Sequence, residues 1–586
     1  MRTPLLACVI AVLVAPPVMP AQITDSLPLD SVADDYQLPR AVALEIASLF
    51  NQPAALRATG TLVIDADQQV TGDVAVLGGS LTLAGRVTGR VLVINGDVTL
   101  RRGATIGSDL MVVGGMIEGQ DRASVGGQIR WYRQPLYYRR AGDRIVVEPE
   151  DEIGEVAEEG GWLARWRRRN QDGGSKIVLI AGGTYNRVEG LPISLGPAFR
   201  QRTPWGRVSL EALGIIRSAD NFRWDRRNIG YEVEGEVQFG RSRRIAVGST
   251  LFDVVDAVEQ WHLGENEVSL AAFFLRRDYQ DYFNRHGARG YIRFRGWNNA
   301  DLTLAYRSER WGTREERGVF SLFRDADHWR PNPRVDVGRF HIASAALTID
   351  TRNDPDNPWT GWYITTDLER GSSRSTVLGE TSPLARSASE GPVGVAYTRG
   401  FLDLRRYNRL SPKGQLNKRL VLGGWLGGDP LPLQRRLSVS GPATLPGYDF
   451  RTAPGDPDVW QCSDRVQPPG QPAQCERVAL AQVEYRGDLR VTVGGRGRDD
   501  DDDRGWHFSF DRTGAWVVFV DAGRGWLVGP SRVGDLQYRS GAFPALRTFR
   551  TDVGVGLDLD IIGLYIAKAV SVSEGANLFI RLRHRF

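Results

Sequence analysis

The last ten residues of the chain, Asn577–Phe586, alternate between apolar and polar side chains. One face carries Leu578, Ile580, Leu582 and Phe586, with His584 among them, and the other carries Asn577, Phe579, Arg581, Arg583 and Arg585. Successive side chains of a strand point to opposite sides, so this segment has one apolar and one cationic face. In a soluble sandwich the arginines would simply face water. A strand of about ten residues that ends the chain on an aromatic residue also has the length that crosses an outer membrane. We therefore predict the closing strand of a transmembrane β-barrel.

Residues 1–21 have the layout of a secretory signal peptide. Arg2 precedes a short apolar stretch, and Ala21 is a small residue at a suitable cleavage point. Cys8 ends a stretch that looks like a lipoprotein acylation box, but it comes too early to leave an apolar region before it. The sequence predicts export, and no later stretch approaches the eighteen or so apolar residues of a membrane helix.

Composition favours strands, turns and polar surfaces. Glycine is abundant (67 residues), methionine is scarce (4), and charged residues make up 25% of the chain. A net charge of +4 is small for 586 residues, and the arginines are spread along strands rather than gathered into a patch. We expect no nucleic-acid partner.

Two cysteines remain after the signal, Cys462 and Cys475. An exported protein with one close pair is expected to oxidise it. A metal site is the alternative, but two cysteines without nearby histidines are incomplete for zinc. We predict a structural disulfide and no metal.

A short repeat precedes the barrel. The run Val70–Val76 returns as Val87–Val93, as Ile106–Val112 and more loosely as Val125–Trp131. The spacing of about seventeen to nineteen residues is typical of one coil of a β-solenoid. We predict an N-terminal segment, 22–58, whose one helix (Leu38–Phe50) caps the first coil, and a periplasmic solenoid over 59–132.

The solenoid run resembles the bactofilin-like β-helix proteins over about four coils. It is either a spacer or a docking surface for a periplasmic partner or peptidoglycan. Residues 133–175 form a charged linker, with an acidic stretch and then Trp162 and Trp166 beside three arginines. This linker is either solvated or lies in the membrane interface.

Period-2 alternation recurs over residues 176–586. For example, Tyr231, Val233 and Val237 alternate with Glu232, Glu234 and Glu236. An interior this charged cannot be a dry core, but it can be a wet lumen inside an apolar wall. Counting from Leu191 gives about sixteen strands, an even number that suits an outer-membrane barrel. On this count the eleventh strand lies near Leu420–Leu426 and the twelfth near Val478–Arg486, and the sixth external loop between them holds both late cysteines.

Several segments of the barrel carry recognisable motifs: Tyr185–Leu191, Asp350–Pro355 with Gly361–Trp362, Glu484–Arg486, Phe519–Gly523 and the loop motif Leu445, Pro446, Gly447 and Tyr448. These segments resemble the BamA/TamA family of outer-membrane assembly barrels, the bacterial surface antigen family. Together they span about 410 residues in the family's order. The resemblance implies an inward-folded sixth loop, lumen-wall partners at Glu484, Arg486, Asp521 and Gly523, and a seam between the first and last strands. On this reading Leu195 lies on the first strand, and Phe579 and Phe586 lie on the last.

Two departures from the family affect these expectations. Pro446 stands where the family has an arginine, so we expect Arg451 to reach Glu484 or Asp521 instead. The solenoid also occupies the place of the family's POTRA repeats, which puts recruitment of clients by those repeats in doubt.

The sequence shows no nucleophile elbow, Walker loop or zinc-protease motif, and its six histidines have no ligand spacing. The acidic run Asp499–Asp503 is either a calcium site or, as we expect, a solvated turn. We predict a protein without enzymatic activity or cofactor in the Gram-negative outer membrane. The first hypothesis is assembly, insertion or translocation of outer-membrane or secreted proteins, with lipid, lipopolysaccharide and unfolded clients as partners. The alternative is a pore or structural anchor that displays the solenoid, and a third reading is a barrel that secretes its own solenoid.

Overall fold

The structure is a computed structural model of the 586-residue chain, and it describes residues 38–586 with gaps. The gaps are 39, 54, 133–134, 137, 142–143, 148–173, 182–183, 204, 240–244, 296–299, 324–327, 353–357, 380–390, 412–413, 449, 451–474, 495–508, 529–531, 534–535, 538–542, 560–561, 571–574 and 583. The predicted signal peptide, most of the linker, Arg451, Cys462 and the run Asp499–Asp503 lie outside the described residues.

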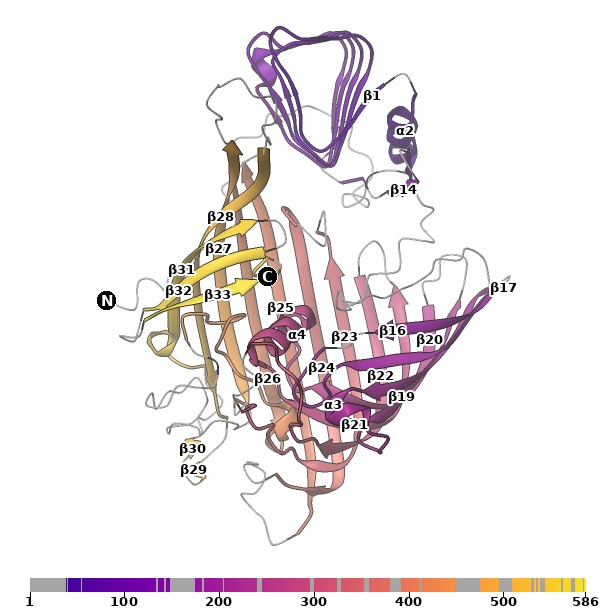
Figure 1. Ribbon diagram of the computed structural model, residues 1–586, viewed down its shortest axis with the longest axis vertical. Helices are drawn as coiled ribbons and strands as arrows, with labels where there is room; N and C mark the ends of the chain where they lie inside the picture. The colour runs from indigo at the N-terminus through magenta and orange to yellow at the C-terminus, as the bar shows by residue number, and fades with distance from the viewer. Residues whose placement is uncertain are drawn as a thin grey trace, which may run out of the picture.

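The N-terminal part is a three-sided parallel β-solenoid, drawn in indigo at the top of Figure 1. The first side consists of β1 (Leu56–Thr59), β4 (Val74–Leu77), β7 (Val91–Ile94), β10 (Leu110–Val113) and β13 (Ile129–Tyr132). The second consists of β2 (Leu62–Ile64), β5 (Leu81–Leu83), β8 (Val98–Leu100) and β11 (Ile117–Glu118), and the third of β3 (Gln69–Val70), β6 (Arg86–Val87), β9 (Thr105–Ile106) and β12 (Ser124–Val125). Val74 pairs with Val91, Val91 with Leu110, and Leu110 with Ile129, so the predicted repeat and its spacing are confirmed.

Valine, leucine and isoleucine from all three sides fill the interior of the solenoid. Stacked glycines mark one corner, where a Cβ on Gly96 would lie 1.9 Å from the carbonyl oxygen of Gly79 in the preceding coil. A side chain at that corner would therefore push the coils apart, which explains the recurring glycine of the repeat.

Helix α2 (Arg40–Phe50) forms where the sequence predicts it, but it does not cap the first coil. Ile46 and Phe50 pack on the outer surface of the first side, against Ala75, Leu92 and Met111. The hairpin of β14 (Arg139–Ala141) and β15 (Arg144–Val146) adds Ile145 to the same cluster. The physical reason is that every residue of β4, β7 and β10 is buried, so the outer apolar side chains of these strands need a cover.

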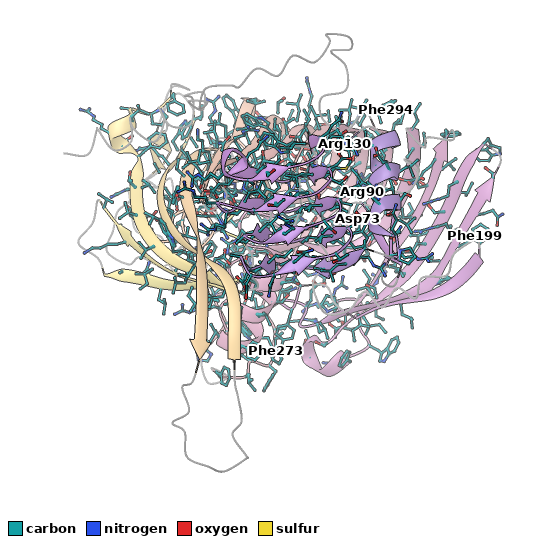
Figure 2. The ribbon with its side chains drawn as sticks, turned by 90° about the horizontal axis from the view of Figure 1, so that it is seen from above. Asp73, Arg90, Arg130, Phe199, Phe273 and Phe294 are labelled. Atoms are coloured by element: carbon teal, nitrogen blue, oxygen red, sulfur yellow. The ribbon has the colours of Figure 1, made fainter. Side chains whose placement is uncertain are left out.

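One ion pair joins successive coils beside α2, where Figure 2 shows Asp73 and Arg90. The Asp73 carboxylate accepts hydrogen bonds from the Arg90 backbone N–H (2.7 Å) and from its Nη2 (2.7 Å). Partial burial alone would raise the pKa of Asp73, but hydrogen bonding and the charge of Arg90 outweigh it and lower that pKa. A lowered folded-state pKa stabilises the fold above the unfolded pKa of about 3.9, and this stabilisation is lost as the pH falls through the folded pKa.

We expect Asp73→Asn to lower the local stability of the solenoid by less than about 1 kcal/mol at pH 7, because both side chains are partly exposed and solvent screens the pair. The difference from the wild-type protein should shrink well below pH about 3.9. Urea-dependent hydrogen exchange of peptides from β4 and β7, followed by mass spectrometry, measures both effects. Asp67→Asn, in an exposed turn, is the control. A loss of stability that stayed constant down to low pH would contradict the role of the charge.

The C-terminal part is one antiparallel sheet of sixteen strands in sequence order, strongly curled around an interior (Figure 1). Its strands are β16 (Gly174–Ala181), β17 (Pro192–Thr203), β18 (Gly206–Arg217), β19 (Ile229–Phe239), β20 (Ile245–Ala257), β21 (Tyr282–Arg295), β22 (Ala300–Thr313), β23 (Val337–Asp350), β24 (Gly361–Val377), β25 (Val393–Ser411), β26 (Gly414–Gly428), β27 (Arg477–Gly494), β28 (Ser509–Trp526), β31 (Arg550–Leu559), β32 (Ile562–Ala569) and β33 (Ala576–Arg581). A separate small hairpin joins β29 (Arg532–Val533) and β30 (Leu536–Gln537). The predicted all-β fold is confirmed, and the predicted eleventh and twelfth strands lie within β26 and β27.

The first strand is not where the sequence analysis placed it. The sheet begins with β16, which lies mostly within the predicted start of the barrel but two residues into the predicted linker, and Leu191–Arg200 belongs mainly to the second strand, β17. Strand β16 is only eight residues long and follows a charged stretch, so it offers little alternation from which to recognise it.

The two faces of the sheet differ in the predicted way. Large apolar side chains are exposed on the outer face, among them Leu210, Leu251, Ile292, Leu304 and Val555. Figure 2 shows Phe199, which is also exposed, at the outer margin of the sheet. Charged side chains face inward and are buried there by one another, as in the pair of Arg285 with Glu309 at 2.8 Å.

Two short helices in the connections between strands lie inside the curl (Figure 1). They are α3 (Ala219–Phe222) and α4 (Glu265–Leu275). Within the described residues, no helix is long and apolar enough to cross a membrane.

Candidate functional site

The sixth loop, residues 429–476, folds into the interior and is fastened to the wall at its start. The Leu433 backbone N–H donates to Asp336, in the connection before β23, at 2.9 Å. Arg435 donates to Glu369 of β24 at 2.8 Å, and Glu369 also binds Arg307. Burial alone would lower the pKa of Arg435, but the charge of Glu369 raises it above its usual range, so the guanidinium stays charged.

The two ends of the loop are joined to each other at its base. Arg436 pairs with Glu476 at 2.9 Å, and both side chains are almost fully buried. Leu437 and Cys475 form an antiparallel backbone bridge, and Cys475 is disulfide-bonded. The partner predicted for Cys475, Cys462, lies outside the described residues, so the pairing itself stays a prediction.

The loop motif Leu445–Tyr448 reaches the last three strands of the sheet. The Gly447 backbone N–H donates to Asp552 of β31 at 2.7 Å, and the Tyr448 hydroxyl donates to the Thr551 carbonyl at 3.2 Å. The Pro446 carbonyl accepts from Asn577 of β33 at 3.2 Å. The motif thus lies beside the final strands, as an inward-folded loop requires.

Close packing explains the glycines of this contact. A Cβ on Gly447 would lie 2.7 Å from both the backbone nitrogen of Ala569 and the Cβ of Asp552. A Cβ on Gly523 of β28 would lie 2.7 Å from Val439 and 3.4 Å from Leu445, so Gly523 leaves room for the loop. Leu445 is fully buried in an apolar cluster with Val439 of the same loop and with Val421, Val478 and Leu480 of the wall.

The lumen-wall acids Glu484 and Asp521 are paired with a residue that the sequence analysis missed. Arg585, the penultimate residue, is buried, forms an ion pair with Asp521, and lies 3.7 Å from Glu484. Its guanidinium also covers the ring of Phe519, 3.5 Å from the ring centroid. Arg451, the predicted partner, lies outside the described residues. The sequence did show a cationic face in the C-terminal segment, which includes Arg585. We interpreted that face only as one side of a strand and not as a source of partners for the wall acids.

Arg486 joins a second part of the same cluster. It pairs with Asp558 of β31 at 2.7 Å and lies 3.7 Å from Glu484. Asp558 also contacts the His584 ring at 2.8 Å. Asp521 and Asp552 are direct cross-strand neighbours, both fully buried. The cluster therefore connects the loop tip, at Gly447, with the end of the chain.

The end of the chain does not continue the last strand. β33 stops at Arg581, and Phe586, which was predicted to lie on the closing strand, is beyond its end and buried. The predicted faces of β33 itself are correct: Leu578 and Ile580 are 72% and 59% exposed, and Phe579 and Arg581 are buried. Continued as a strand, the segment would turn His584 outward with Leu578 and Ile580, whereas the inward turn brings it to Asp558.

Helix α4 also contacts this segment. The Glu267 carboxylate accepts from Arg581 Nε at 2.6 Å and from the Leu582 backbone N–H at 3.0 Å. Val268 of the same helix packs against Ala443 of the sixth loop. The helix, the loop and the C-terminal segment thus form one connected plug.

The seam lies between β16 and β33. In the described part of the sheet, β16 pairs only with β17, and β33 pairs only with β32. The two strands lie on opposite margins of the opening that faces the reader in Figure 1. Leu195 is therefore not a seam residue, because its strand, β17, has a neighbour on each side.

The segment Tyr185–Leu191 is a connection between β16 and β17 and not a strand. Arg187 is completely buried there and pairs with Asp278 at 3.0 Å and Asp281 at 2.9 Å, both in the connection after α4. The motif therefore fastens the connection that follows the first strand to the segment that carries α4.

Comparison with known proteins gives likenesses of fold only. BamA from Haemophilus ducreyi lacking POTRA domains 1–3 matches with a TM-score of 0.37 and 14% identity, covering 70% of this chain and 69% of that one. CdiB from Escherichia coli matches with a TM-score of 0.31 and 10% identity, over 76% and 67%. The siderophore receptor PirA from Pseudomonas aeruginosa matches with a TM-score of 0.24 and 9% identity, over 70% and 74%.

No protein-family model and no curated protein matches the chain. The first of these structures bears the name of the family that the sequence resembles.

Proposed function

We propose that the protein is an outer-membrane β-barrel that assists the assembly, insertion or translocation of other outer-membrane or secreted proteins. Its outer face exposes many large apolar side chains. In water such a surface would promote aggregation, whereas in a membrane it would contact the lipid acyl chains. Lipid and lipopolysaccharide are thus its proposed surroundings, and unfolded barrel proteins are its proposed clients. The solenoid then lies in the periplasm.

The observation that carries the proposal is the pair of unpaired strand edges. Among the described strands, β16 and β33 have only one neighbour each, so backbone N–H and C=O groups face the opening. In hydrocarbon each backbone N–H or C=O group without a hydrogen-bond partner costs several kcal/mol of free energy. An incoming strand satisfies them by adding to the edge, which is β-augmentation. The seam is therefore suited to receive a strand from a client.

The plug argues against a simple open pore. The sixth loop is held by Glu369 on β24 and by Asp552 on β31, and α4 is held by Arg581. The contacts of Glu369 with Arg435 and of Glu267 with Arg581 are ion pairs, whose hydrogen bonds are stronger than neutral ones. Single-channel recordings should show small flickering events, and a large steady conductance would favour the pore.

Photo-crosslinking in cells tests strand addition. A photoreactive residue at Leu578 lies on β33, whereas one at its cross-strand partner Ile566 lies on β32, which is paired on both sides. Both side chains are exposed on the outer face. We expect adducts with other outer-membrane barrel chains at Leu578 and far fewer at Ile566. Equal labelling at both sites, or adducts within the chain alone, would contradict the proposal.

The second candidate is an anchor that holds the solenoid at the membrane. It is favoured by one contact between the two parts, an ion pair of Asp97 in the solenoid with Arg409 near the end of β25. Arg409 also stacks on Trp359, with its guanidinium 4.4 Å from the ring centroid. An outer-membrane proteome that stays unchanged on depletion of the protein would support this candidate over the first.

A further inference from the structure

We propose that the protein binds the phosphorylated headgroup of lipopolysaccharide at one surface of the barrel, on the end away from the solenoid. Three connections between strands build this surface, here called the aromatic–arginine surface. They are residues 219–227 before β19, the end of α4 with Arg277, and residues 317–323 before β23. The inference rests on the proposed membrane location and adds a defined lipid partner to it.

The three connections lie at the same end of the sheet. Arg409, near the end of β25, contacts Asp97 of the solenoid, and β25 is the tenth strand of the antiparallel sheet. The three connections follow the third, fifth and seventh strands, which run opposite to β25. Figure 1 accordingly shows α3 in the half of the sheet farther from the solenoid. With the solenoid in the periplasm, this end meets the outer leaflet, whose main lipid is lipopolysaccharide.

Buried contacts pack the three connections into one unit. Ala219, Ala272 and Val319, one from each connection, form an apolar cluster with Trp329. Two backbone hydrogen bonds, of 2.8 and 3.2 Å, join residues 322–323 to α4. The side chains that project from the three connections therefore keep fixed positions relative to one another.

Large apolar side chains project from this unit into its surroundings. Trp224 is 79% exposed and Phe323 is 69% exposed. The backbone of Phe222 has a φ of 58°, a conformation that is rare for a bulky residue and that recurs at ligand sites. The other exposed apolar residues of the surface are Leu275, Phe320 and Leu322. So many exposed apolar side chains on one packed unit indicate contact with an apolar partner.

Exposed arginines accompany these apolar side chains. Asp225, the acid among them, already accepts hydrogen bonds from the backbone N–H groups of residues 227 and 228, at 2.8 and 2.9 Å. It also lies 3.9 Å from Arg317. The surface therefore has an excess of positive charge, carried by Arg223, Arg226, Arg227 and Arg277. Guanidinium groups suit phosphate, because their paired N–H donors match its oxygens.

The two kinds of side chain together select the chemistry of the partner. A soluble polyanion would use the arginines and leave the aromatic side chains in water. An uncharged lipid would use the aromatic side chains and leave the arginines without an anion. A lipid that carries phosphate on its headgroup uses both, with aromatic residues at the membrane interface and arginines at the headgroup. Lipid A, the phosphorylated glycolipid that anchors lipopolysaccharide, is such a molecule and lies in the leaflet that this surface meets.

Native mass spectrometry of the full-length protein in detergent tests the proposal. The probes are lipid A with its phosphates, lipid A from which the phosphates have been removed, and phosphatidylglycerol. We expect the wild-type protein to bind phosphorylated lipid A about tenfold more tightly than either of the other two lipids.

Substitutions separate the two contributions. Arg223→Gln with Arg226→Gln should weaken binding of phosphorylated lipid A by about tenfold and leave binding of the dephosphorylated form unchanged, since only the phosphate loses its partners. Trp224→Ala should weaken both forms by a similar factor, because it removes an apolar contact. All three side chains are exposed, so the fold should be retained.

Two matched controls should bind both forms of lipid A as the wild-type protein does. Arg101→Gln with Arg102→Gln removes the same charge from an exposed turn of the solenoid. Phe543→Ala removes an exposed aromatic side chain from the connection after β28, which lies at the same end of the sheet as the proposed surface.

Three results would overturn the inference. They are equal binding of the two forms of lipid A by the wild-type protein, equally tight binding of phosphatidylglycerol, and an equal loss of binding in the controls. No client takes part in the measurement, so a failure of the lipid site would be separate from a failure of the proposed function, which the crosslinks at Leu578 decide.

Discussion

Gly447→Ala is expected to lift the tip of the sixth loop off the last strands and to destabilise the seated loop by about 3–5 kcal/mol. The added methyl group would meet backbone atoms of Ala569 and Lys568, which cannot move without disturbing β32. A shift of the loop also breaks the hydrogen bond from the Gly447 N–H to Asp552 and leaves that buried carboxylate without this donor. Overpacking and the loss of a buried hydrogen bond add in the same direction.

Hydrogen exchange of the peptide that contains the loop motif measures this opening. The matched control is Gly427→Ala at the end of β26, close to the start of the same loop, where a Cβ would have nothing within 4 Å. We expect a loss of protection of more than a hundredfold for Gly447→Ala and little change for Gly427→Ala, since about 1.4 kcal/mol corresponds to a factor of ten. Equal protection in both variants would show that the tip is not seated as described.

Arg436→Met is expected to open the base of the loop at a cost of about 3–5 kcal/mol, because it leaves the buried carboxylate of Glu476 without its cation. The Arg436 side chain is fully buried, and Glu476 keeps a hydrogen bond from the Val528 N–H at 2.9 Å, which does not neutralise its charge. Protection of the peptide over 433–448 should fall accordingly in hydrogen exchange.

The double variant Arg436→Met, Glu476→Leu shows whether the effect comes from the buried Glu476 charge that has lost its partner. An apolar pair in place of a buried ion pair is often tolerated, so we expect the double variant to be more stable than Arg436→Met alone. If the two substitutions added their costs, lost packing rather than an unpaired charge would explain the single variant.

Features with a local period were predictable from the sequence. The two-residue alternation of apolar and polar side chains predicted a sheet with an apolar outer face and a charged inner face, and it correctly placed the eleventh and twelfth strands. The repeat with its recurring glycines predicted the solenoid and its spacing. Both patterns arise because backbone geometry assigns faces residue by residue. The strand β16 was misplaced because its short apolar run has no alternation of its own. Helix α2 was found but assigned to the wrong surface, since an amphipathic pattern shows that a helix has an apolar face and not what covers it.

The candidate site was predictable only in part. The loop motif and the wall acids Glu484 and Asp521 were found through a resemblance. Their cation, Arg585, was missed because its pairing depends on a turn after Arg581 that the alternating pattern does not show. The position of α4 was also missed, since the contact of Glu267 with Arg581 joins residues that are 314 positions apart. Contacts of that separation leave no trace in a local window of sequence.

That separation has a consequence for how the protein folds. The interior cannot be completed before the final residues of the chain arrive, because Arg581 and Arg585 supply cations to Glu267 and Asp521, which come much earlier in the chain. Contacts between residues so distant in sequence are slow to form, since the entropy of closing the intervening chain is lost before they contribute. Until then the carboxylates of Glu267 and Asp521 would lack these cations and would keep the half-built lumen hydrated. We therefore expect the plug to be completed late in folding, and we expect a variant that lacks Arg581 and Arg585 to have an ordered wall around a less ordered interior.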